Sequence, residues 1–245
     1  MSVLSDLRVL YHMVANPVKG DTHAERLDSF YAGQSGDYDD FRKRLLPGRQ
    51  ELWSEIPTAR DGAVWIDMGG GTGSNLENFG GDITQLKQVY VVDLSRSLLD
   101  VAEQRTAAAG WHNVEIVEAD ATQFQPPTDK ADVVTFSYSL TMIPDWFAAV
   151  QNAIACLRPG GILGVVDFYV ARKYPQSHNQ RHGWLTRAGW PLWFASDNVF
   201  LSPDHLPFLQ QQLETVSLTE ARGKVPYLPL VRVPYYRFVG RKPSC

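Results

Sequence analysis

The sequence has 245 residues, of which 44% are hydrophobic and 20% are charged, and its formal net charge is −4. These values indicate a globular protein with an ample hydrophobic core, built as one large domain or as one domain with a cap. No stretch approaches the roughly 18 uninterrupted apolar residues of a membrane-spanning helix. The N-terminal residues lack the basic region and apolar core of a signal peptide, so we expect neither feature.

The cysteine and histidine patterns argue against a disulfide-rich protein and against a metal-binding protein. The two cysteines, Cys156 and Cys245, form no disulfide framework, which suits a reducing cytoplasm. The six histidines are scattered and have no HxxxH or CxxC partners. No metal site is therefore predicted.

The basic residues are unevenly placed along the chain. Residues 168–196 and 221–245 hold ten of the 23 lysines and arginines and no acid, which leaves 13 basic residues against 27 acids elsewhere. These two segments would be attracted to an anionic surface that repels the rest of the chain.

The N-terminal part of the chain is predicted to be helical. Residues 2–15 place apolar side chains at helical spacing, which indicates a packing helix. An interfacial membrane helix is the alternative, but the stretch has little basic character. Residues 22–55 predict two or three further helices rich in aromatic residues and arginine. Their position before the first strand suits a lid over a cofactor pocket. A solvated amphipathic helix whose arginines extend to water explains any one of these residues equally well.

The first predicted strand, residues 63–66, is followed by an acid and then by glycines at alternate positions, namely Asp67, Gly69, Gly71 and Gly73. This pattern indicates a buried parallel strand that ends in a tight turn into a helix, which Ser74 or Asn75 can cap. Glycine is required where the backbone takes positive φ or lies against a ligand. The spacing fits neither the dinucleotide fingerprint, which needs a glycine at position 74, nor the P-loop, which needs a lysine.

Two further predicted strands, residues 89–92 and 114–118, also end close to acids. Asp93 follows the second strand and can accept both hydroxyls of a ribose that lies across the first turn. Asp120 and Ala121 follow the third strand, where they can read an adenine edge. Each acid alone could instead be a helix cap or a turn residue. Because parallel strands bring their carboxyl ends to one edge of a sheet, the acids together favour a nucleoside site.

The remaining predicted elements complete an α/β pattern. They are a helix over 95–109, a strand over 131–136, a helix over 146–157, a strand over 162–167, a helix over 204–211 and strands over 213–220 and 235–241. Residues 168–211 depart from the pattern, because tryptophans, prolines and glycines cluster there. A short loop joins the last two strands, so we expect a hairpin whose final strand is antiparallel to the rest.

This order of motifs resembles that of class I S-adenosylmethionine-dependent methyltransferases. The resemblance implies an α/β, Rossmann-like, doubly wound sheet of seven strands with the last strand antiparallel. It also implies a single domain over residues 1–245. Its parts are an N-terminal helical lid (1–58), a cofactor-binding core (59–167), an acceptor or cap insertion (168–211) and a closing hairpin (212–245).

By the same resemblance, the cofactor is S-adenosylmethionine and the product is S-adenosylhomocysteine. The residues implied to bind it are Asp67, Gly69, Gly71, Gly73, Asp93, Leu94, Asp120, Ala121, Ser137, Tyr38 and Arg49. Arg49, or else Arg44, would meet the methionine carboxylate as a charge-assisted partner.

Methyl transfer from a sulfonium is an in-line displacement with an activated leaving group, so the protein mainly aligns the reactants and excludes water. A nitrogen acceptor must be unprotonated, and an aromatic hydroxyl beside it would help to hold and deprotonate it. Tyr31 and Tyr138 are the candidate catalytic residues. Either tyrosine can equally be a packing residue.

Three segments outside the shared motifs, residues 26–49, 193–206 and 227–241, look like those of betaine-lipid N-methyltransferases. These enzymes convert diacylglyceryl-homoserine to diacylglyceryl-trimethylhomoserine. The resemblance implies an amino-lipid acceptor whose binding residues include Arg42, Thr141 and Arg181. Either arginine could meet the homoserine carboxylate.

A lipid acceptor stays in the membrane, so we expect a cytoplasmic protein in transient contact with the membrane surface. Acid-free basic segments with interleaved tryptophans suit such an interface. Alternatively, residues 184–200 cap the acceptor pocket while the arginines face solvent. Both interpretations can hold together.

Two other functions remain open. One is methyl transfer to another small molecule, a quinone precursor or a free amine. The other is a non-catalytic nucleoside-binding protein, against which the acids and glycines of the first three turns argue. Nucleic acid is not a predicted partner, because the net charge is acidic and residues 137–140, Ser-Tyr-Ser-Leu, hold no Asn/Asp-Pro-Pro-Tyr-like motif.

Overall fold

The computed structural model describes residues 46–57, 61–127, 130–195, 198–225 and 228–244. In these ranges the chain forms one seven-stranded sheet in the order β3-β2-β1-β4-β5-β7-β6. Its strands are β1 (Val64–Met68), β2 (Gln88–Asp93), β3 (Val114–Glu118), β4 (Ala131–Ser137), β5 (Leu157–Phe168), β6 (Glu214–Val225) and β7 (Leu228–Arg241). Strands β1 to β5 run parallel, whereas β7 is antiparallel to both of its neighbours. The predicted fold class, including the antiparallel last strand, is therefore confirmed.

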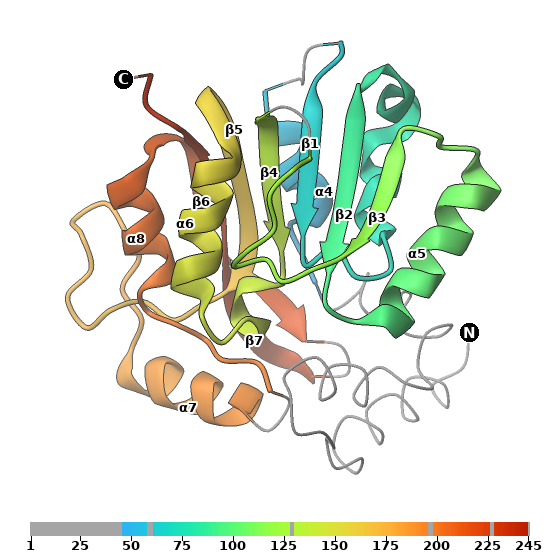
Figure 1. Cartoon of the computed structure of the whole chain (residues 1–245). Helices are drawn as coiled ribbons and strands as arrows, with labels where there is room; N and C mark the ends of the chain where they lie inside the picture. The colour runs from blue at the N-terminus through green and yellow to red at the C-terminus, as the bar shows by residue number, and fades with distance from the viewer. Residues whose placement is uncertain (1–45, 58–60, 128–129, 196–197, 226–227, 245) are drawn as a thin grey trace.

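Helices cover both faces of the sheet (Figure 1). They are α4 (Arg49–Glu55), η1 (Ser74–Gln85), α5 (Arg96–Ala109), η2 (Leu140–Met142), α6 (Trp146–Cys156), α7 (Trp184–Ala195) and α8 (His205–Gln212). On one face, Val150 of α6 and Leu209 of α8 are buried in one hydrophobic cluster. On the other face, Leu52 of α4, Ile83 of η1 and Leu99 of α5 are buried in a second. Every residue of β1 is buried because the strand is covered on both sides.

The parallel strands bring four turns together at one edge of the sheet. The register pairs Met68, the last residue of β1, with Val92 of β2 and with Phe136 of β4. It also pairs Asp93, at the end of β2, with Glu118, at the end of β3. The turns that follow β1, β2, β3 and β4 therefore lie side by side, where an open α/β sheet binds its ligand.

The segment after the glycine turn is helical as expected, but neither Ser74 nor Asn75 caps it. η1 is a 3-10 helix whose N-cap is Gly73, with φ of 67°, and no side chain caps it. A Gly-Gly pair inside η1 disfavours an α-helix, since each glycine costs about 1 kcal/mol relative to alanine. Ser74 and Asn75 instead accept hydrogen bonds from the arginine that begins α4.

Residues 168–211 contain a helix that the sequence pattern did not reveal. α7 forms although Pro191 lies inside it, and proline and glycine in this segment made it look irregular. The helix lies at the lower end of the molecule in Figure 1, beyond the carboxyl ends of the parallel strands. Within the described ranges, no helix has the length and hydropathy needed to cross a membrane.

Candidate active site

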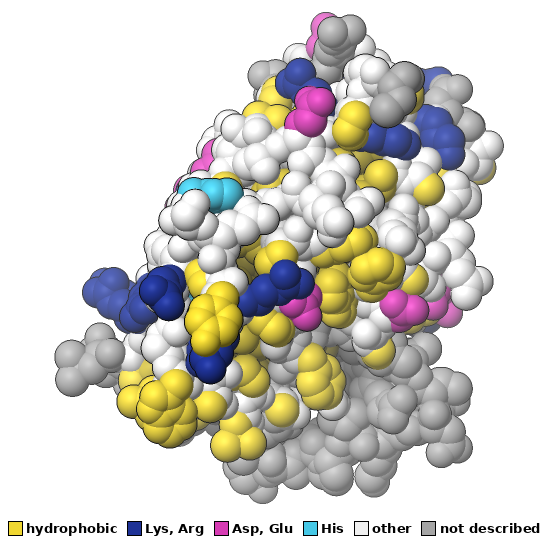
Figure 2. All heavy atoms as spheres, turned by 90° about the vertical axis from the view of Figure 1, so that its left-hand side faces the viewer, with side chains coloured by type: hydrophobic (Ala, Val, Ile, Leu, Met, Phe, Trp, Pro, Cys, Tyr) yellow, Lys and Arg dark blue, Asp and Glu magenta, His cyan; other side chains and the backbone are white. Residues whose placement is uncertain are grey.

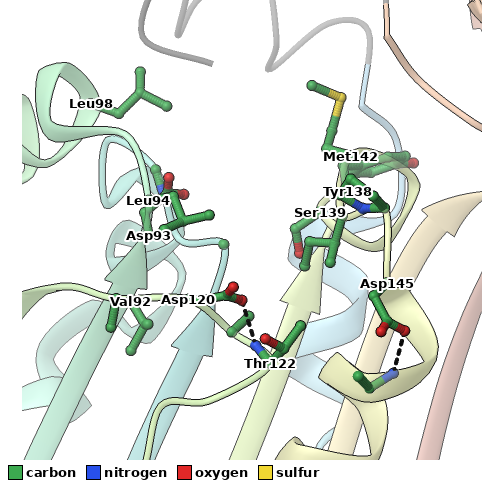
Figure 3. Close-up of a pocket in the computed structure, with 17 residues that line it drawn as sticks. Val92, Asp93, Leu94, Leu98, Asp120, Thr122, Tyr138, Ser139, Met142 and Asp145 are labelled. Carbon is green, nitrogen blue, oxygen red and sulfur yellow. Dashed lines mark hydrogen bonds between the residues drawn. The ribbon is translucent and has the colours of Figure 1, made fainter. Parts of the chain in front are cut away.

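A cavity of about 370 Å³ lies at the carboxyl ends of β1 to β4 (Figure 3). This volume is typical of a small-molecule site. The predicted site residues that line it are Gly69, Gly71, Asp93, Leu94, Asp120, Ala121 and Tyr138. The structure thus brings together residues from four turns that are far apart in the sequence.

The glycine turn presents bare backbone to this cavity. Gly69 and Gly71 have φ values of 68° and 55°, in the left-handed region that favours glycine. The Gly69 amide donates to the Val92 carbonyl at 2.8 Å, which fixes the turn against β2. A Cβ on Gly69 would contact Ser139, with the serine Oγ only 2.9 Å away. No side chain can therefore be added at Gly69 without displacing the facing wall.

Two carboxylates stand at the ends of β2 and β3 on one side of the cavity. Asp93 accepts the amides of Gly71 and Ser95 through its two oxygens, each at 2.9 Å. Asp120 accepts the Thr122 amide at 2.8 Å. Figure 3 shows both acids on the side opposite Ser139 and Met142. Backbone amides thus hold each carboxylate in place at the cavity wall.

Asp67 supports the glycine turn from behind and does not line the cavity. Its side chain is 1% exposed, and its carboxylate accepts hydrogen bonds from Asn75 Nδ2 at 2.8 Å and Thr135 Oγ1 at 2.9 Å. Burial raises the pKa of Asp67 to about 6, although both hydrogen bonds favour the charged form. A carboxylate at this position therefore ties β1, β4 and the start of η1 together.

Arg49 and Gly73 lie near the glycine turn but outside the cavity. The Arg49 guanidinium donates to Ser74 Oγ at 2.7 Å and, through Nε, to Asn75 Oδ1 at 3.0 Å. Arg49 also borders a second cavity of about 430 Å³, beside Ser74 and Glu77. Asn75 forms hydrogen bonds with both Arg49 and Asp67. The three side chains therefore form a hydrogen-bonded series that runs from Arg49 to Asp67 behind the glycine turn.

Tyr138 lines the cavity with a constrained geometry. Its φ is 55°, one of two positive values among the described non-glycine residues. The hydroxyl donates to the Pro47 carbonyl, and the ring packs on Phe168 at 4.7 Å between centroids. Burial, reinforced by the charge of Asp167, raises the pKa of Tyr138 well above its ordinary value. The hydroxyl is therefore protonated at neutral pH, and its hydrogen bond ties it to the residues just before α4.

Thr141 and Ser137 are buried beside the cavity wall. Thr141 donates to Asp167 through its amide at 3.1 Å and through Oγ1 at 2.8 Å. Burial raises the pKa of Asp167 to about 7, although these hydrogen bonds lower it. The Ser137 hydroxyl is buried and has no hydrogen-bond partner among the described residues. Asp167 thus anchors the segment that follows β4.

The remaining predicted site residues lie elsewhere. Arg181 is exposed in the loop before α7. Tyr31, Tyr38 and Arg42 lie outside the described residues, so their roles stay predictions.

Sequence reasoning missed most of the wall that faces the two acids. Ser139, Met142, Ile143 and Asp145 line the cavity there, and Asp145 caps α6 by accepting the Ala148 amide at 3.0 Å. Their signal was positional, because they directly follow a parallel strand at the ligand-binding edge. Apolar residues at such a position look like core residues in the sequence.

The sequence profile of a family described as "Methyltransferase domain" matches residues 36–221. The chain belongs to this methyltransferase family. Curated relatives of the methyltransferase include the ubiquinone/menaquinone biosynthesis C-methyltransferase UbiE of Pseudomonas fluorescens strain Pf0-1. That relative is 29% identical over 169 residues, which cover 67% of this chain and 66% of the relative. UbiE of Shewanella woodyi is 27% identical over 64% of each chain. The methyltransferase thus spans slightly under two thirds of the length of these relatives.

Solved structures show the same fold. The Haemonchus contortus "Phospholethanolamine N-methyltransferase 2", solved with phosphomonomethylethanolamine and S-adenosylhomocysteine, has a TM-score of 0.68 at 14% identity, over 91% of this chain and 61% of that one. The YcgJ protein of a Bacillus has a TM-score of 0.64 at 16% identity, over 80% and 99%. At these identities the likeness concerns the fold alone.

S-adenosylmethionine is the methyltransferase's cofactor, and the residues of the cavity fit it. When bound, it supplies a methyl group on a positively charged sulfur. The Asp93 carboxylate would accept ribose hydroxyls, and Asp120 with Ala121 would flank the adenine. The bare backbone at Gly69 and Gly71, which lines the cavity, would lie along the amino-acid part.

Proposed function

We propose that the methyltransferase acts on the amino nitrogen of a membrane-lipid head group, with diacylglyceryl-homoserine as the acceptor and successive methyl transfers. The proposal starts from the three segments whose sequences resemble betaine-lipid N-methyltransferases. These segments are specific to the resemblance, whereas the glycine turn and the acids are shared by many methyltransferases. Acceptor choice depends on the side of the cavity that such shared motifs do not form.

The observation that carries the proposal is that the three segments converge on the Tyr138 side of the cavity. From the first segment, the Pro47 carbonyl accepts the Tyr138 hydroxyl. From the second, Phe194 packs on Phe168 at 5.0 Å between centroids, and Phe168 packs on Tyr138. From the third, Tyr235 lies so close to the backbone next to Pro47 that a side chain there would collide with its ring.

The second segment also contacts the residue that precedes two lining residues of the cavity. The Phe200 amide donates to the Thr141 carbonyl at 2.8 Å. Thr141 precedes Met142 and Ile143, which line the cavity. Segments distant from one another in the sequence thus support one wall from behind, which favours a shared role in holding the acceptor.

The chemistry asked of this wall is modest. In-line methyl transfer requires alignment of donor and acceptor and exclusion of water, which together can lower the barrier by about 7–11 kcal/mol. Behind Tyr138, the rings of Phe168 and Phe194 form a continuous apolar cluster, which would help to keep water from this side. An acceptor nitrogen that arrives unprotonated needs no strong base in the wall.

A quinone precursor is the second candidate acceptor, because curated relatives at 27–29% identity are C-methyltransferases of ubiquinone and menaquinone biosynthesis. Such an acceptor receives the methyl group on carbon and not on nitrogen. Both acceptors are lipids, so hydrophobic solubility does not distinguish them.

The deciding experiment supplies purified protein and isotopically labelled S-adenosylmethionine with each acceptor separately in detergent micelles. The expected result is mono-, di- and trimethylated homoserine lipid by mass spectrometry, with little product from a demethylated quinone. Label in the quinone alone, or only in water-soluble amines, would overturn the lipid-nitrogen assignment. The Asp93→Ala variant serves as the donor-binding control and should give no product from either acceptor.

A further inference from the structure

Helix α7 lies at the same end of the molecule as the cavity and is joined to its wall. Its residue Phe194 is buried against Phe168, which packs on the cavity-lining Tyr138. Trp190 packs on Phe194 from the same side of the helix, at 5.7 Å between centroids. One face of α7 is therefore packed against the Tyr138 side of the cavity, which we call the acceptor wall.

The opposite face of α7 is apolar and exposed. Trp184, Leu185 and Leu192 are 68%, 71% and 80% exposed. At 100° per residue these three lie on one side of the helix, and the other exposed residues of that side are Ala188, Gly189, Trp193 and Ala195. Large apolar side chains that are exposed together on one face mark an interaction surface, so this face is suited to a partner.

Basic residues are frequent in the part of the chain that contains α7, although Arg187 lies on the packed side of the helix, where its Nε is buried. Residues 168–196 contain Arg172, Lys173, Arg181 and Arg187 and no carboxylate. Arg172 forms an ion pair with Asp204, so one of the four charges is offset. Figure 2 shows Lys and Arg side chains beside hydrophobic ones at the lower end of the molecule. The surface thus combines apolar and positive character, as interfacial helices do.

We propose that the exposed face of α7, with the basic residues of this part of the chain, docks on the surface of an anionic lipid bilayer. The occupant follows from charge complementarity, since a positive and apolar surface matches anionic head groups above acyl chains. Tryptophan is also the side chain that favours the level of the head groups. Docking through α7 sets the cavity end of the molecule toward the membrane, where a lipid acceptor resides. This orientation rests on the proposed function, whereas docking itself does not.

A second copy of the chain fits this surface less well. In a two-fold dimer the same patch meets itself, which would bring two acid-free basic segments into one interface. Like charges that face one another across an interface are unfavourable. An anionic bilayer turns the same charges into an attraction.

The test is flotation of the full chain with vesicles of phosphatidylcholine alone or mixed with phosphatidylglycerol. The expected result is binding to the anionic vesicles that weakens as salt is raised. The double variant Trp184→Ser/Leu192→Ser should lower the partition coefficient at least about tenfold, because two exposed apolar side chains no longer insert. Val216→Ser is the matched control, since Val216 is exposed on β6, and should bind as the wild type does.

A second pair of variants tests the contribution of basic side chains to vesicle binding. Lys173→Glu should weaken anionic binding about tenfold, whereas Lys130→Glu, an exposed site between β3 and β4, should not. Unchanged vesicle binding by the α7 double variant would overturn the proposal. Concentration-dependent dimerisation that this variant abolishes, measured by sedimentation velocity without vesicles, would instead assign the surface to a second copy.

Failure of docking and failure of the proposed function give different results. If docking fails, the double variant methylates acceptor in vesicles as fast as the wild type. If only the acceptor assignment fails, the double variant still loses vesicle binding while no homoserine lipid is methylated by any form. If both hold, the double variant loses activity on vesicles and keeps it on a short-chain acceptor in free solution.

Discussion

The two walls of the cavity are built in different ways. The donor wall consists of the turns after β1, β2 and β3, where backbone amides fix Asp93 and Asp120 through contacts within or between neighbouring turns. The acceptor wall consists of the segment after β4, which is held by distant partners such as Pro47, Asp167 and Phe200.

This difference separates binding of the methyl donor, which many methyltransferases share, from choice of the acceptor, which varies among them. Short local contacts fix the donor wall, so a few glycines and acids suffice to rebuild it in many proteins. The acceptor wall depends on packing between segments far apart in the sequence, so it can change without disturbing the donor wall. One fold can thus serve different acceptors, because only the acceptor half of the site needs to change.

The largest expected effect concerns the buried acid of the acceptor wall. Because the pKa of Asp167 is raised to about 7, the unfolded chain binds fewer protons than the folded one between pH 4 and 7. The free energy of unfolding should therefore fall as pH rises through this range, by about 4 kcal/mol from this group.

Denaturant unfolding of wild type and Asp167→Asn at pH 4 and pH 8 checks this. The variant is the less stable form at pH 4, and its deficit should shrink by several kcal/mol at pH 8. Asp67, whose pKa is raised to about 6, is present in both proteins and cancels from the difference. A deficit that does not change with pH would show that Asp167 is not held in a raised-pKa state.

The next effect tests how closely the two walls approach. Gly69→Ala combines a φ of 68° with a contact between the new Cβ and Ser139, so it should lower the free energy of unfolding by about 3 kcal/mol. Gly110→Ala has a similar φ of 69° but nothing within 4 Å, and should cost only about 1 kcal/mol. Equal losses in thermal or denaturant unfolding would mean that the walls separate easily at this point.

Removal of a donor-wall carboxylate should act mainly on donor binding, with a smaller loss of stability because the amides of Gly71 and Ser95 lose their acceptor. Asp93→Ala loses the side chain that would accept ribose hydroxyls, and its affinity for S-adenosylmethionine should fall about 100-fold. Asp145→Ala removes a carboxylate from the facing wall (Figure 3) and should change that affinity by less than about threefold. Isothermal titration calorimetry measures both, and similar losses would contradict the division into two walls.

The smallest effect concerns the hydroxyl of Tyr138. Tyr138→Phe leaves the Pro47 carbonyl without its donor and should lower the free energy of unfolding by about 1 kcal/mol. Donor affinity should not change. A fall in kcat of more than about 100-fold at unchanged stability would instead show that the hydroxyl acts on the acceptor directly.

The donor wall was largely predictable from the sequence, because its signals are local. An apolar run that ends in an acid and alternate glycines requires a strand, a turn and left-handed backbone, and the structure places Gly69 and Gly71 at that turn. Asp93 and Asp120 follow from the same reasoning. The cavity that they line is the one expected from parallel strands.

The acceptor wall could not be predicted in the same way. The positive φ of Tyr138 has no signal in a tyrosine, and its contact with Pro47 spans 91 residues. Helix α7 was missed because Pro191 and Gly189 mimic a loop. The cap of η1 was also predicted wrongly, because Gly73, and neither Ser74 nor Asn75, occupies its N-cap position.

The place of β7 in the sheet has a consequence for how the molecule assembles. β7 follows the other strands in the chain but lies between β5 and β6. Strands β1 to β5 can pair with one another as soon as residue 168 has been made, whereas β6 must wait for the strand that comes after it. Loss of residues 228–241 would therefore strip two strands from the sheet at once.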